Sequence, residues 1–442
     1  MCGLVYVAVN VLCCGPRGVN NNLFMATEAD LAAHHESLMS SDYNRTKAGL
    51  GAGPARSSEV KADMVASHYN SLQDRHRTLE AGSEILHLRN LNNWIKSVLF
   101  NKHIFRGDRR SRTGAAVLDL ACGKGGDMLK FRASDIALYV GLDIAANSVR
   151  DAVGRYNGQH GRPGMPFGAQ FMAGDFCAPD LLERLPKSLS STRFQLATCQ
   201  FALHYAFSTE ERASQLLANA ARRLEIEHGV FVATIPDANV LVKRLRAADG
   251  LSFGNPLYQV EFTATSQTKA FRADASPFGI AYRFSLKEAV EDCEEYLVHL
   301  PTLKRVAKTH GLELLYAANF TDFFANEWPH HADLLERMKV LPADGSLSQD
   351  EWDVAHCYMV VAFRRVALPG EVAVPPQPVR NPGNRKLQPD TDIIYLNPAD
   401  AAAAEEENAA ASGGSAGLKR GTPDLDASTM GKKRARGDDD TA

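Results

Sequence analysis

Short apolar runs rich in β-branched and aromatic residues recur along the middle of the chain. Seven of them have the length of a single strand and predict strands over Ala116–Ala121, Ile136–Ile144, Phe167–Ala173, Phe194–Phe201, Val230–Ile235, Leu312–Asn319 and Tyr358–Phe363. Segments of helical length separate several of these runs; in 210–224, for example, Leu216, Ala220 and Leu224 recur at helical spacing. Strands that alternate with helices predict an α/β fold, with a mostly parallel seven-stranded sheet and helices on both faces.

Three stretches depart from this alternation. Residues 1–62 are rich in Ala, Gly, Ser and Asn, which predicts a disordered N-terminal region ahead of a folded domain over 63–366. Residues 236–300 are long for a connection between two strands, so we expect an inserted lid subdomain over the site. Residues 367–442 are Pro-rich, then Ala/Glu-rich, then Gly/Ser-rich, which predicts a disordered tail that does not pack.

The charge distribution narrows the function classes. The 442 residues carry a net charge of −3, and residues 367–442 hold 12 acids and 9 bases, which leaves 40 charges of each sign in residues 1–366. A balanced folded part argues against a broad, non-specific nucleic-acid binder, so any nucleic-acid contact should be local. No apolar run reaches the length of a membrane-spanning helix, which argues against a membrane protein.

Two basic clusters lie in the tail. Lys419–Arg420 and Lys432–Arg436 are separated by eleven residues and resemble a bipartite nuclear-import signal, which predicts a nuclear protein. The alternative is a charged tail that only improves solubility.

The cysteine and histidine patterns favour neither a disulfide framework nor a metal site. None of the eight cysteines forms a C-x-x-C pair, and the fourteen histidines include no H-E-x-x-H. We expect reduced thiols and no bound metal.

The most distinctive local feature is a glycine-rich turn that follows the first predicted strand, in "VLDLACGKGGDMLKF" (Val117–Phe131). A P-loop would need an earlier glycine and a hydroxyl after Gly123-Lys124, and a dinucleotide fingerprint would need a third glycine where Met128 stands. The remaining pattern, acidic-x-small-x-G-x-G, is typical of S-adenosylmethionine methyltransferases. A tight strand-to-helix turn without a ligand remains the alternative.

Two acids further along strengthen the cofactor interpretation. Asp143 ends the next strand, about 20 residues beyond the loop, where a carboxylate can accept both ribose hydroxyls. Asp175 follows the third strand, placed to meet the adenine amino group, and Phe176 is placed to pack on the ring. An acid at one strand end is often only a helix cap. Two such acids beside a glycine loop indicate a ligand at the carboxyl edge of the sheet.

Flanking motifs narrow the substrate further. They are "HYN" (His68–Asn70), "LRNLNNWIKSVL" (Leu88–Leu99), "CQFALHYAF" (Cys199–Phe207), "SFGNPLYQVEF" (Ser252–Phe262), "EYLVHLP" (Glu295–Pro301) and "CYMVVAFRR" (Cys357–Arg365). Together with the glycine loop they resemble the mRNA cap guanine-N7 methyltransferases, in collinear order over about residues 63–366. The resemblance implies a Rossmann-like methyltransferase fold, S-adenosylmethionine as cofactor and a 5′-capped mRNA as substrate. It also implies a monomeric protein that acts alongside RNA polymerase II or other capping machinery and does not bind a membrane.

The resemblance assigns roles to residues of this chain. It implies that Lys96 pairs with the cofactor carboxylate, while Asn92 and Asn93 contact the capped RNA end; a surface lysine beside a capping asparagine is the alternative. The other implied cofactor residues are Ala121, Gly123, Gly125, Asp143, Asp175, Gln200 and Tyr205. Ala121 departs from the glycine usual in the family, and its methyl group is expected to affect cofactor affinity more than cofactor identity.

A guanine pocket follows partly from chemistry. Guanine presents adjacent N1–H and N2–H donors, which one carboxylate can accept together, and Glu295 is the matching family position. His204 would donate to guanine O6, and Tyr205 and Tyr358 would wall the base. The alternatives are a solvated acidic helix face for Glu295 (Glu291, Asp292, Glu294 and Glu295), and buried core roles for the histidine and the two tyrosines.

Three cations and the mechanism complete the expectations. Lys124, Lys130 and Arg155 resemble the family's contacts to the cap triphosphate, although each alone would be a routine surface cation. Guanine N7 is unprotonated at neutral pH, so the transfer needs in-line positioning and no acid–base catalyst.

Two other functions stay open: a small-molecule methyltransferase on the same fold, and a catalytically impaired homologue that binds capped RNA or activates a partner.

Overall fold

The computed structural model describes residues 82–104, 113–158, 163–263, 269–271, 275–343, 345–375 and 379–397. Four features predicted above lie outside these residues: the N-terminal region 1–62, the motif His68–Asn70, and the two basic clusters Lys419–Arg420 and Lys432–Arg436.

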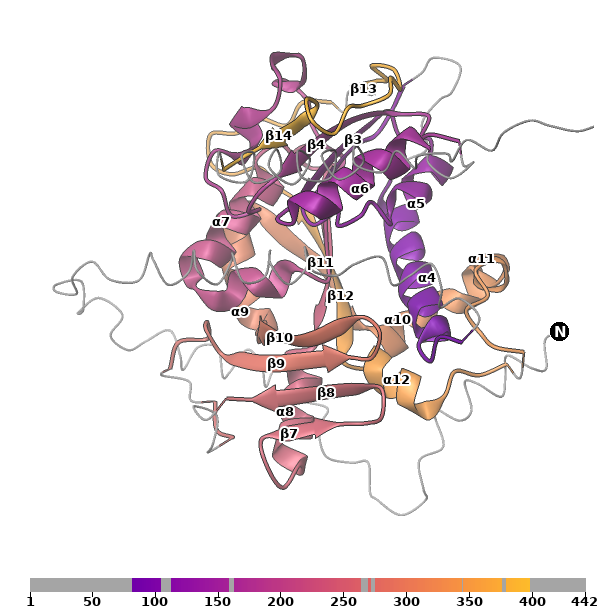
Figure 1. The fold of residues 1–442 in the computed structure, drawn as a ribbon. Helices are drawn as coiled ribbons and strands as arrows, with labels where there is room; N and C mark the ends of the chain where they lie inside the picture. Colours follow the sequence, from indigo (N-terminus) through magenta and orange to yellow (C-terminus); the bar gives the residue numbers. More distant parts are fainter. Residues whose placement is uncertain are drawn as a thin grey trace, which may run out of the picture.

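The centre of the molecule is one eight-stranded sheet (Figure 1). Its spatial order is β11 (Leu312–Asn319), β12 (Tyr358–Arg365), β6 (Val230–Pro236), β5 (Leu196–Gln200), β2 (Ala116–Asp119), β3 (Leu138–Asp143), β4 (Gly168–Ala173) and β14 (Ile393–Tyr395). The strands from β6 to β14 are parallel to their neighbours, whereas β12 runs antiparallel to both β6 and β11. The predicted mostly parallel sheet is therefore confirmed, but the predicted count of seven strands is wrong.

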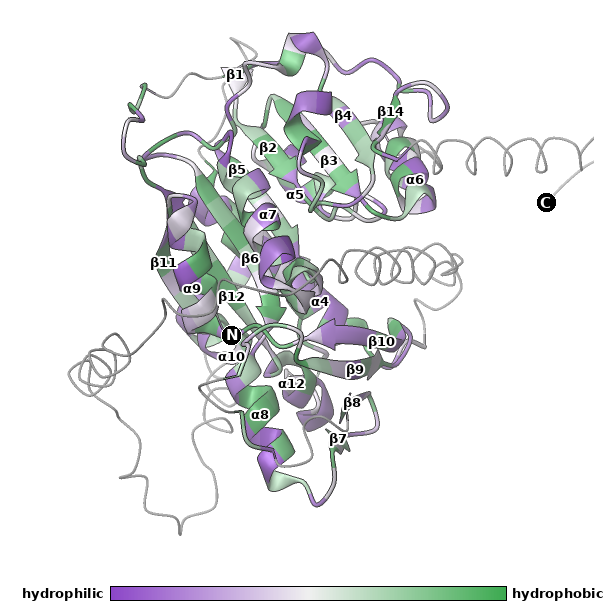
Figure 2. Ribbon diagram, turned by 90° about the vertical axis from the view of Figure 1, so that its left-hand side faces the viewer, coloured by the Kyte–Doolittle hydropathy of each residue, from purple (hydrophilic) through white to green (hydrophobic). Residues whose placement is uncertain are grey.

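Five central strands bury both faces, which explains their nearly continuous apolar sequences; they are β2, β3, β5, β6 and β12. The edge strand β11 is partly exposed. Along β2, Val117 packs into one apolar cluster, while its neighbours Ala116 and Leu118 pack into the other. Figure 2 shows these strands mainly in green between helices of mixed colour. Helices α4 (Leu86–His103), α5 (Met128–Ala133) and α6 (Ala146–Asn157) belong to the first cluster; α7 (Glu210–Ala221) and α9 (Leu300–Thr309) belong to the second.

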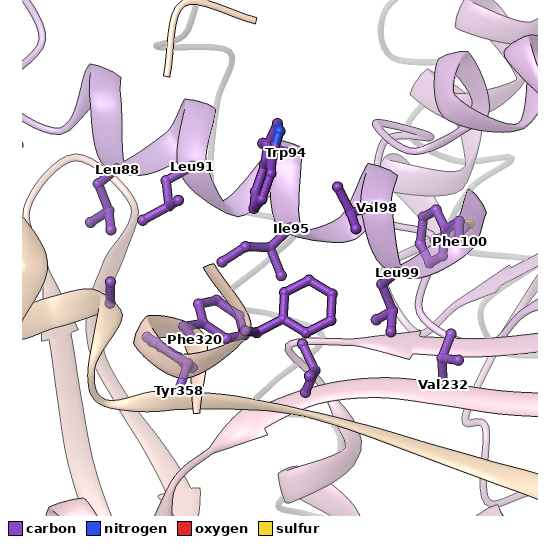
Figure 3. Close-up of a cluster of buried hydrophobic side chains, with 14 of the residues drawn as sticks. Leu88, Leu91, Trp94, Ile95, Val98, Leu99, Phe100, Val232, Phe320 and Tyr358 are labelled. Carbon is purple, nitrogen blue, oxygen red and sulfur yellow. The ribbon is translucent and has the colours of Figure 1, made fainter. Parts of the chain in front are cut away.

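The long helix α4 is fixed by one apolar stripe. Leu88, Leu91, Trp94, Ile95, Val98 and Leu99 are all buried. Figure 3 shows Ile95 and Leu99 of this stripe on the side of Phe320, the first residue of α10 (Phe320–Glu327), and Val232 of β6. Because each fully buried apolar side chain of this size contributes about 1.5–3 kcal/mol, the position of α4 over the sheet is strongly determined. The polar residues Asn92, Asn93 and Lys96 are thereby held in place.

The segment 236–300 forms a second, antiparallel sheet of four strands. Its elements are α8 (Ala238–Ala247), β7 (Ser252–Gly254), β8 (Tyr258–Phe262), β9 (Ala281–Leu286) and β10 (Val290–Tyr296). Residues buried along β8 alternate with exposed ones, as expected for a sheet with one solvated face. The alternative that placed Glu295 on a solvated helix face is wrong, because residues 290–296 are strand β10 and the Glu295 side chain is buried.

The prediction that residues 367–442 do not pack is wrong for residues 379–397. Strand β13 (Val379–Arg380) pairs with β1 (Thr113–Gly114), and β14 adds a parallel strand beside β4. The composition of this stretch did not indicate a strand, because Ile393–Tyr395 is only three residues long and is too short to stand out within a Pro-rich stretch. An open sheet edge can still bind such a run through main-chain hydrogen bonds.

The remaining helices are short. They are α11 (Ala332–Arg337), α12 (Gln349–Ala355) and the 3₁₀ turns Leu181–Arg184, Lys187–Leu189, Leu203–Ser208 and Trp328–His330. Among the residues that the structure describes, no helix is both long enough and apolar enough to cross a membrane.

Candidate active site

The glycine loop joins β2 to α5, and glycine is needed at positions 123 and 125 for different structural reasons. Gly125 has φ +71°, and a Cβ there would meet the Met128 Cε atom and lie 3.2 Å from Ala152 Cβ, so the loop packs closely on α6. Gly123 has φ +50°, and nothing lies within 4 Å of the position a Cβ would take. Bare backbone therefore faces open space at Gly123, as a ligand that approaches the main chain requires. The neighbouring Ala121 is partly buried against the apolar cluster on the α7 side.

Asp143, at the end of β3, holds this loop. Its Oδ2 accepts a hydrogen bond from the Gly123 N–H at 2.7 Å, and its Oδ1 accepts one from the Ala145 N–H at 3.0 Å. Burial raises the pKa of Asp143, and the backbone donors oppose that shift. A carboxylate offers about four acceptor positions, so the backbone donors leave capacity for a ribose hydroxyl.

Asp175, after β4, is held by a partner that the sequence did not indicate. Its two oxygens accept from the Arg212 guanidinium of α7, at 2.7 and 3.3 Å, and Oδ1 also accepts from the Cys177 N–H at 2.8 Å. The next residue, Phe176, is fixed through its carbonyl, which accepts from Asn219 Nδ2 at 2.7 Å. The loop that would face adenine is therefore tied to α7 at two points.

Lys96 lies in a compact ion cluster between α4 and α5. Lys96 Nζ and Lys130 Nζ each lie 2.7 Å from Asp127 Oδ1, and Lys130 also donates to Asn93 Oδ1 at 2.9 Å. Burial opposes ionisation of Asp127, but the two ammonium groups outweigh it and hold the pKa of that carboxyl well below its usual range. Asp127 was missed at the sequence level. Its spacing of three residues from Lys130 was visible, whereas its contact with Lys96 was not.

The three cations expected at the cap triphosphate do not form one group. Lys130 is mostly buried in the Asp127 cluster on the α4 side. Lys124 pairs with Asp151 of α6 at 3.0 Å, and Arg155 is exposed one turn further along α6, close to Gly126. Lys124 lies within the glycine loop and Arg155 lies beside it, so an anionic ligand at the loop would meet these two cations.

Buried acceptors without partners lie at the ends of β2 and β5 and on helix α4. Asp119 Oδ1, Gln200 Oε1 and Asn92 Oδ1 are buried, and none has a hydrogen-bond partner among the described residues. Asp119 pairs in register with Thr198, two residues before Gln200, so their strand ends adjoin. Unsatisfied buried acceptors are costly, and an ammonium group with three N–H donors would satisfy them. The α-ammonium and carboxylate of S-adenosylmethionine fit this region, with Lys96 close by.

Asp119 is a further missed residue. Its Oδ2 accepts a hydrogen bond from the Tyr139 hydroxyl at 2.7 Å. Burial, followed by the negative charge of Asp127, raises the pKa of Asp119 to about 7. The acidic position of the glycine-loop motif was visible in the sequence, but its burial and its raised pKa were not.

A second group of polar side chains lies where the 3₁₀ turn Leu203–Ser208 meets β10. His204 Nε2 lies 3.5 Å from Glu295 Oε1, and neither ring nitrogen of His204 has a hydrogen-bond partner within the described residues. Glu295 Oε2 accepts from the Tyr282 hydroxyl at 2.7 Å, across the register pair that joins β9 and β10. Burial and the Glu295 charge raise the pKa of Tyr282 far above its usual range. Tyr282, absent from the sequence-based site, orients the carboxylate.

The two predicted wall residues differ in their surroundings. The Tyr205 hydroxyl lies 3.4 Å from Cys293 Sγ, and its ring lies 4.3 Å from that of His204. Tyr358 is buried in an aromatic cluster, with ring centroids 5.2 Å from Phe201 and 5.7 Å from Phe320. Tyr205 therefore adjoins the His204–Glu295 pair, whereas Tyr358 also serves as a core aromatic.

Gln200 ends β5, and His204 follows four residues later. One short segment therefore joins the residues around the glycine loop, here called the cofactor half, to the residues around Glu295. In the part of the chain that the structure describes, no three His, Cys, Asp or Glu side chains are grouped closely enough to hold a metal ion.

Comparison with known proteins gives consistent matches. A family model for the mRNA (guanine-N(7))-methyltransferase domain matches residues 54–366. A relative from Oryza sativa subsp. japonica, mRNA cap guanine-N(7) methyltransferase 1, is 41% identical over 360 residues, which cover 79% of this chain and 92% of the relative. The protein of that name from Arabidopsis thaliana is 39% identical, with coverages of 69% and 81%. A relative from Drosophila melanogaster, mRNA cap guanine-N(7) methyltransferase, is 36% identical, with coverages of 70% and 79%.

Proposed function

The chain belongs to the mRNA (guanine-N7)-methyltransferase family, and we propose how its own residues carry out that reaction. The enzyme transfers a methyl group from S-adenosylmethionine to N7 of the guanine that caps the 5′ end of mRNA. The observation that carries the residue assignment is the buried Glu295 carboxylate, which accepts a hydrogen bond from Tyr282 and lies 3.5 Å from His204. His204 in turn follows Gln200, the last residue of β5, by four residues.

Glu295 recognises the base in this proposal. A carboxylate accepts both the N1–H and the N2–H of guanine, whereas adenine offers no such pair of donors. Because Glu295 is only 5% exposed, its hydrogen bonds form in a region of low dielectric, where they are stronger than in water. His204 Nε2, on the same side, would donate to guanine O6.

The cofactor half orients the donor. Asp143 accepts from the ribose, the segment at Asp175 and Phe176 faces adenine, and Lys96 pairs with the cofactor carboxylate. Bound S-adenosylmethionine supplies a methyl group on a positively charged sulfur. Gln200 and Asp119 hold the ammonium group through their unpaired oxygens.

The protein acts by positioning. The N7–methyl bond forms as the methyl–sulfur bond breaks, and the positive charge passes from sulfur to the purine. N7 carries its own lone pair, so no side chain removes a proton. Holding the reacting atoms in line supplies about 7–11 kcal/mol of the barrier reduction. The Glu295 charge also favours the base as it becomes cationic.

The test uses purified full-length protein with labelled S-adenosylmethionine. Label should enter GpppA and not m7GpppA, whose N7 already carries a methyl group, nor ApppA, which lacks guanine. Transfer to free small acceptors instead would favour a small-molecule methyltransferase. Binding of S-adenosylhomocysteine without transfer to any acceptor would favour a catalytically impaired homologue.

We also propose a place of action. The basic clusters Lys419–Arg420 and Lys432–Arg436 support import into the nucleus, where capped transcripts arise. There the enzyme would act as a monomer beside RNA polymerase II or other capping machinery. A fluorescent fusion tests the location, and copurification with the polymerase tests the partner.

A further inference from the structure

Residues 379–397, here called the C-terminal strap, lie beyond the matched family region, which ends at residue 366. The strap follows the β4 edge of the main sheet, and Figure 1 shows β13 and β14 in yellow at that end of the molecule. β14 pairs with β4 in parallel, with Tyr395 opposite Ala173, and the Leu396 N–H donates to the Ala173 carbonyl at 2.9 Å. The added strand therefore ends at the point where β4 gives way to the segment expected to face adenine.

Glycines at the two ends of β4 make room for strap side chains. At Gly168, a Cβ would collide with the Pro382 ring. At Gly174, a Cβ would lie only 2.6 Å from Leu396 Cβ and 2.8 Å from its Cγ and Cδ1. The Leu396 side chain thus rests directly on the Gly174 backbone, a contact that any side chain at position 174 would remove.

The strap is anchored well before it reaches Leu396. Asn157 of α6 donates to the Leu387 carbonyl at 2.7 Å and accepts from the Leu387 N–H at 2.8 Å. Gln170 donates to the Asp392 carbonyl at 2.9 Å, and Arg150 pairs with Asp390 at 2.9 Å. Because α6 and β4 are parts of the main core, these bonds hold Leu396 in a defined position.

Gly174 links the two acids of the cofactor half. Its N–H donates to the Asp143 carbonyl at 2.9 Å, and the residue that follows it is Asp175. We propose that Leu396 is a positioning residue for the adenine end of the S-adenosylmethionine site, acting through Gly174. This inference rests on the proposed function, because it takes the segment after β4 to face adenine.

The expected effect is on affinity for the adenosine moiety. If Leu396 is truncated, Gly174 loses its cover and the Asp175 segment is held only by its contacts with Arg212 and Asn219 of α7, so a fraction of the molecules leaves the binding conformation. Measured affinity falls in proportion to the fraction of molecules that keep the binding conformation. On the cap side, Glu295 interacts with His204 and Tyr282, neither of which belongs to the strap, so the cap side should be unaffected.

The experiment compares Leu396→Ala with Ile394→Ala in the full-length protein. Ile394 lies on β14, two residues before Leu396, packs against the same apolar cluster and pairs opposite Met172. It therefore matches Leu396 in chemistry but not in its contact with Gly174. Calorimetry gives the Kd for S-adenosylhomocysteine and for S-inosylhomocysteine, in which the adenine amino group is replaced. Thermal unfolding gives the Tm, and Leu396→Met restores an apolar side chain of similar size.

We expect Leu396→Ala to raise the Kd for S-adenosylhomocysteine about tenfold, equivalent to about 1.4 kcal/mol. Its preference for adenine over hypoxanthine should shrink, KM for GpppA should stay unchanged, and Leu396→Met should recover most of the affinity. Ile394→Ala should lower the Tm to a similar degree with little change in Kd. Equal effects of the two alanine variants on Kd would overturn the inference and leave the strap as an edge cover. Absence of wild-type binding to S-adenosylhomocysteine would overturn the proposed function itself.

Discussion

Glu295→Gln is the most decisive substitution, because the structure sets the surroundings of both carboxylate oxygens. Oε2 accepts from Tyr282 at 2.7 Å, and Oε1 faces His204 Nε2 at 3.5 Å. Glutamine keeps the size of the side chain but has one acceptor oxygen and no charge. If that oxygen stays with Tyr282, the new NH₂ group points at the guanine donors. If the amide turns round, the Tyr282 hydroxyl must accept instead of donate.

Either orientation removes a charge-assisted hydrogen bond to guanine, worth about 1.5–3 kcal/mol, and the first adds a donor–donor contact of about 1–3 kcal/mol. We expect a combined loss of about 3–5 kcal/mol in kcat/KM for GpppA, roughly 10²- to 10³-fold or somewhat more at about 1.4 kcal/mol per decade. The Kd for S-adenosylhomocysteine should barely change. Tyr282→Phe keeps the Glu295 charge but removes the hydrogen bond that orients the carboxylate, so we expect a smaller loss of about fivefold, in line with one hydrogen bond of about 1 kcal/mol.

The assay is initial-rate transfer of label from S-adenosylmethionine to GpppA, together with cofactor calorimetry and thermal unfolding. Glu291→Gln is the matched control, since Glu291 is an exposed residue of the same strand and its substitution should change kcat/KM by less than about 0.5 kcal/mol. Near-wild-type transfer by Glu295→Gln would refute the guanine pocket. Loss of cofactor binding as well as transfer would instead show that β10 had been disturbed.

Three further predictions concern other parts of the chain. Asp143→Ala should weaken S-adenosylhomocysteine binding by about 1.5–3 kcal/mol for each ribose hydrogen bond lost, and unchanged calorimetry would remove Asp143 from the site. Burial raises the pKa of Asp119 to about 7 in the folded protein, above its ordinary value of 3.8, so the stability that its neutral form contributes is lost as the pH rises from about 4 through 7. Urea unfolding of Asp119→Asn should therefore show a flatter dependence of stability on pH over that range than the wild type. Parallel profiles would contradict the raised pKa. Deleting residues 431–442 removes the second basic cluster and should move a fluorescent fusion from nucleus to cytoplasm, whereas retained nuclear signal would show that the tail is only solubilising.

Several features of this protein followed from the sequence alone. Each of its seven apolar runs contains a strand of the main sheet, and five of these strands belong to the parallel part, where burial requires nearly continuous apolar residues, a local property. The positions of Asp143 and Asp175 beside the glycine loop followed as well, since parallel strands bring their carboxyl ends to one edge.

The tertiary structure alone decided which side chains meet. Arg212 holds Asp175 from 37 residues away, Asp127 joins Lys96 to Lys130, and Tyr282 holds Glu295 across two strands. Such pairs leave no periodic trace, because a hydrogen bond between distant elements depends on how those elements pack. The burial of Glu295 was hidden in the same way: an acidic run is compatible with a solvated helix or with a strand, and the pairing of β10 with β9 turned its side chain inward. The strand β14 was hidden for a related reason, since three residues gain their stability from the open edge of β4 and not from their own sequence.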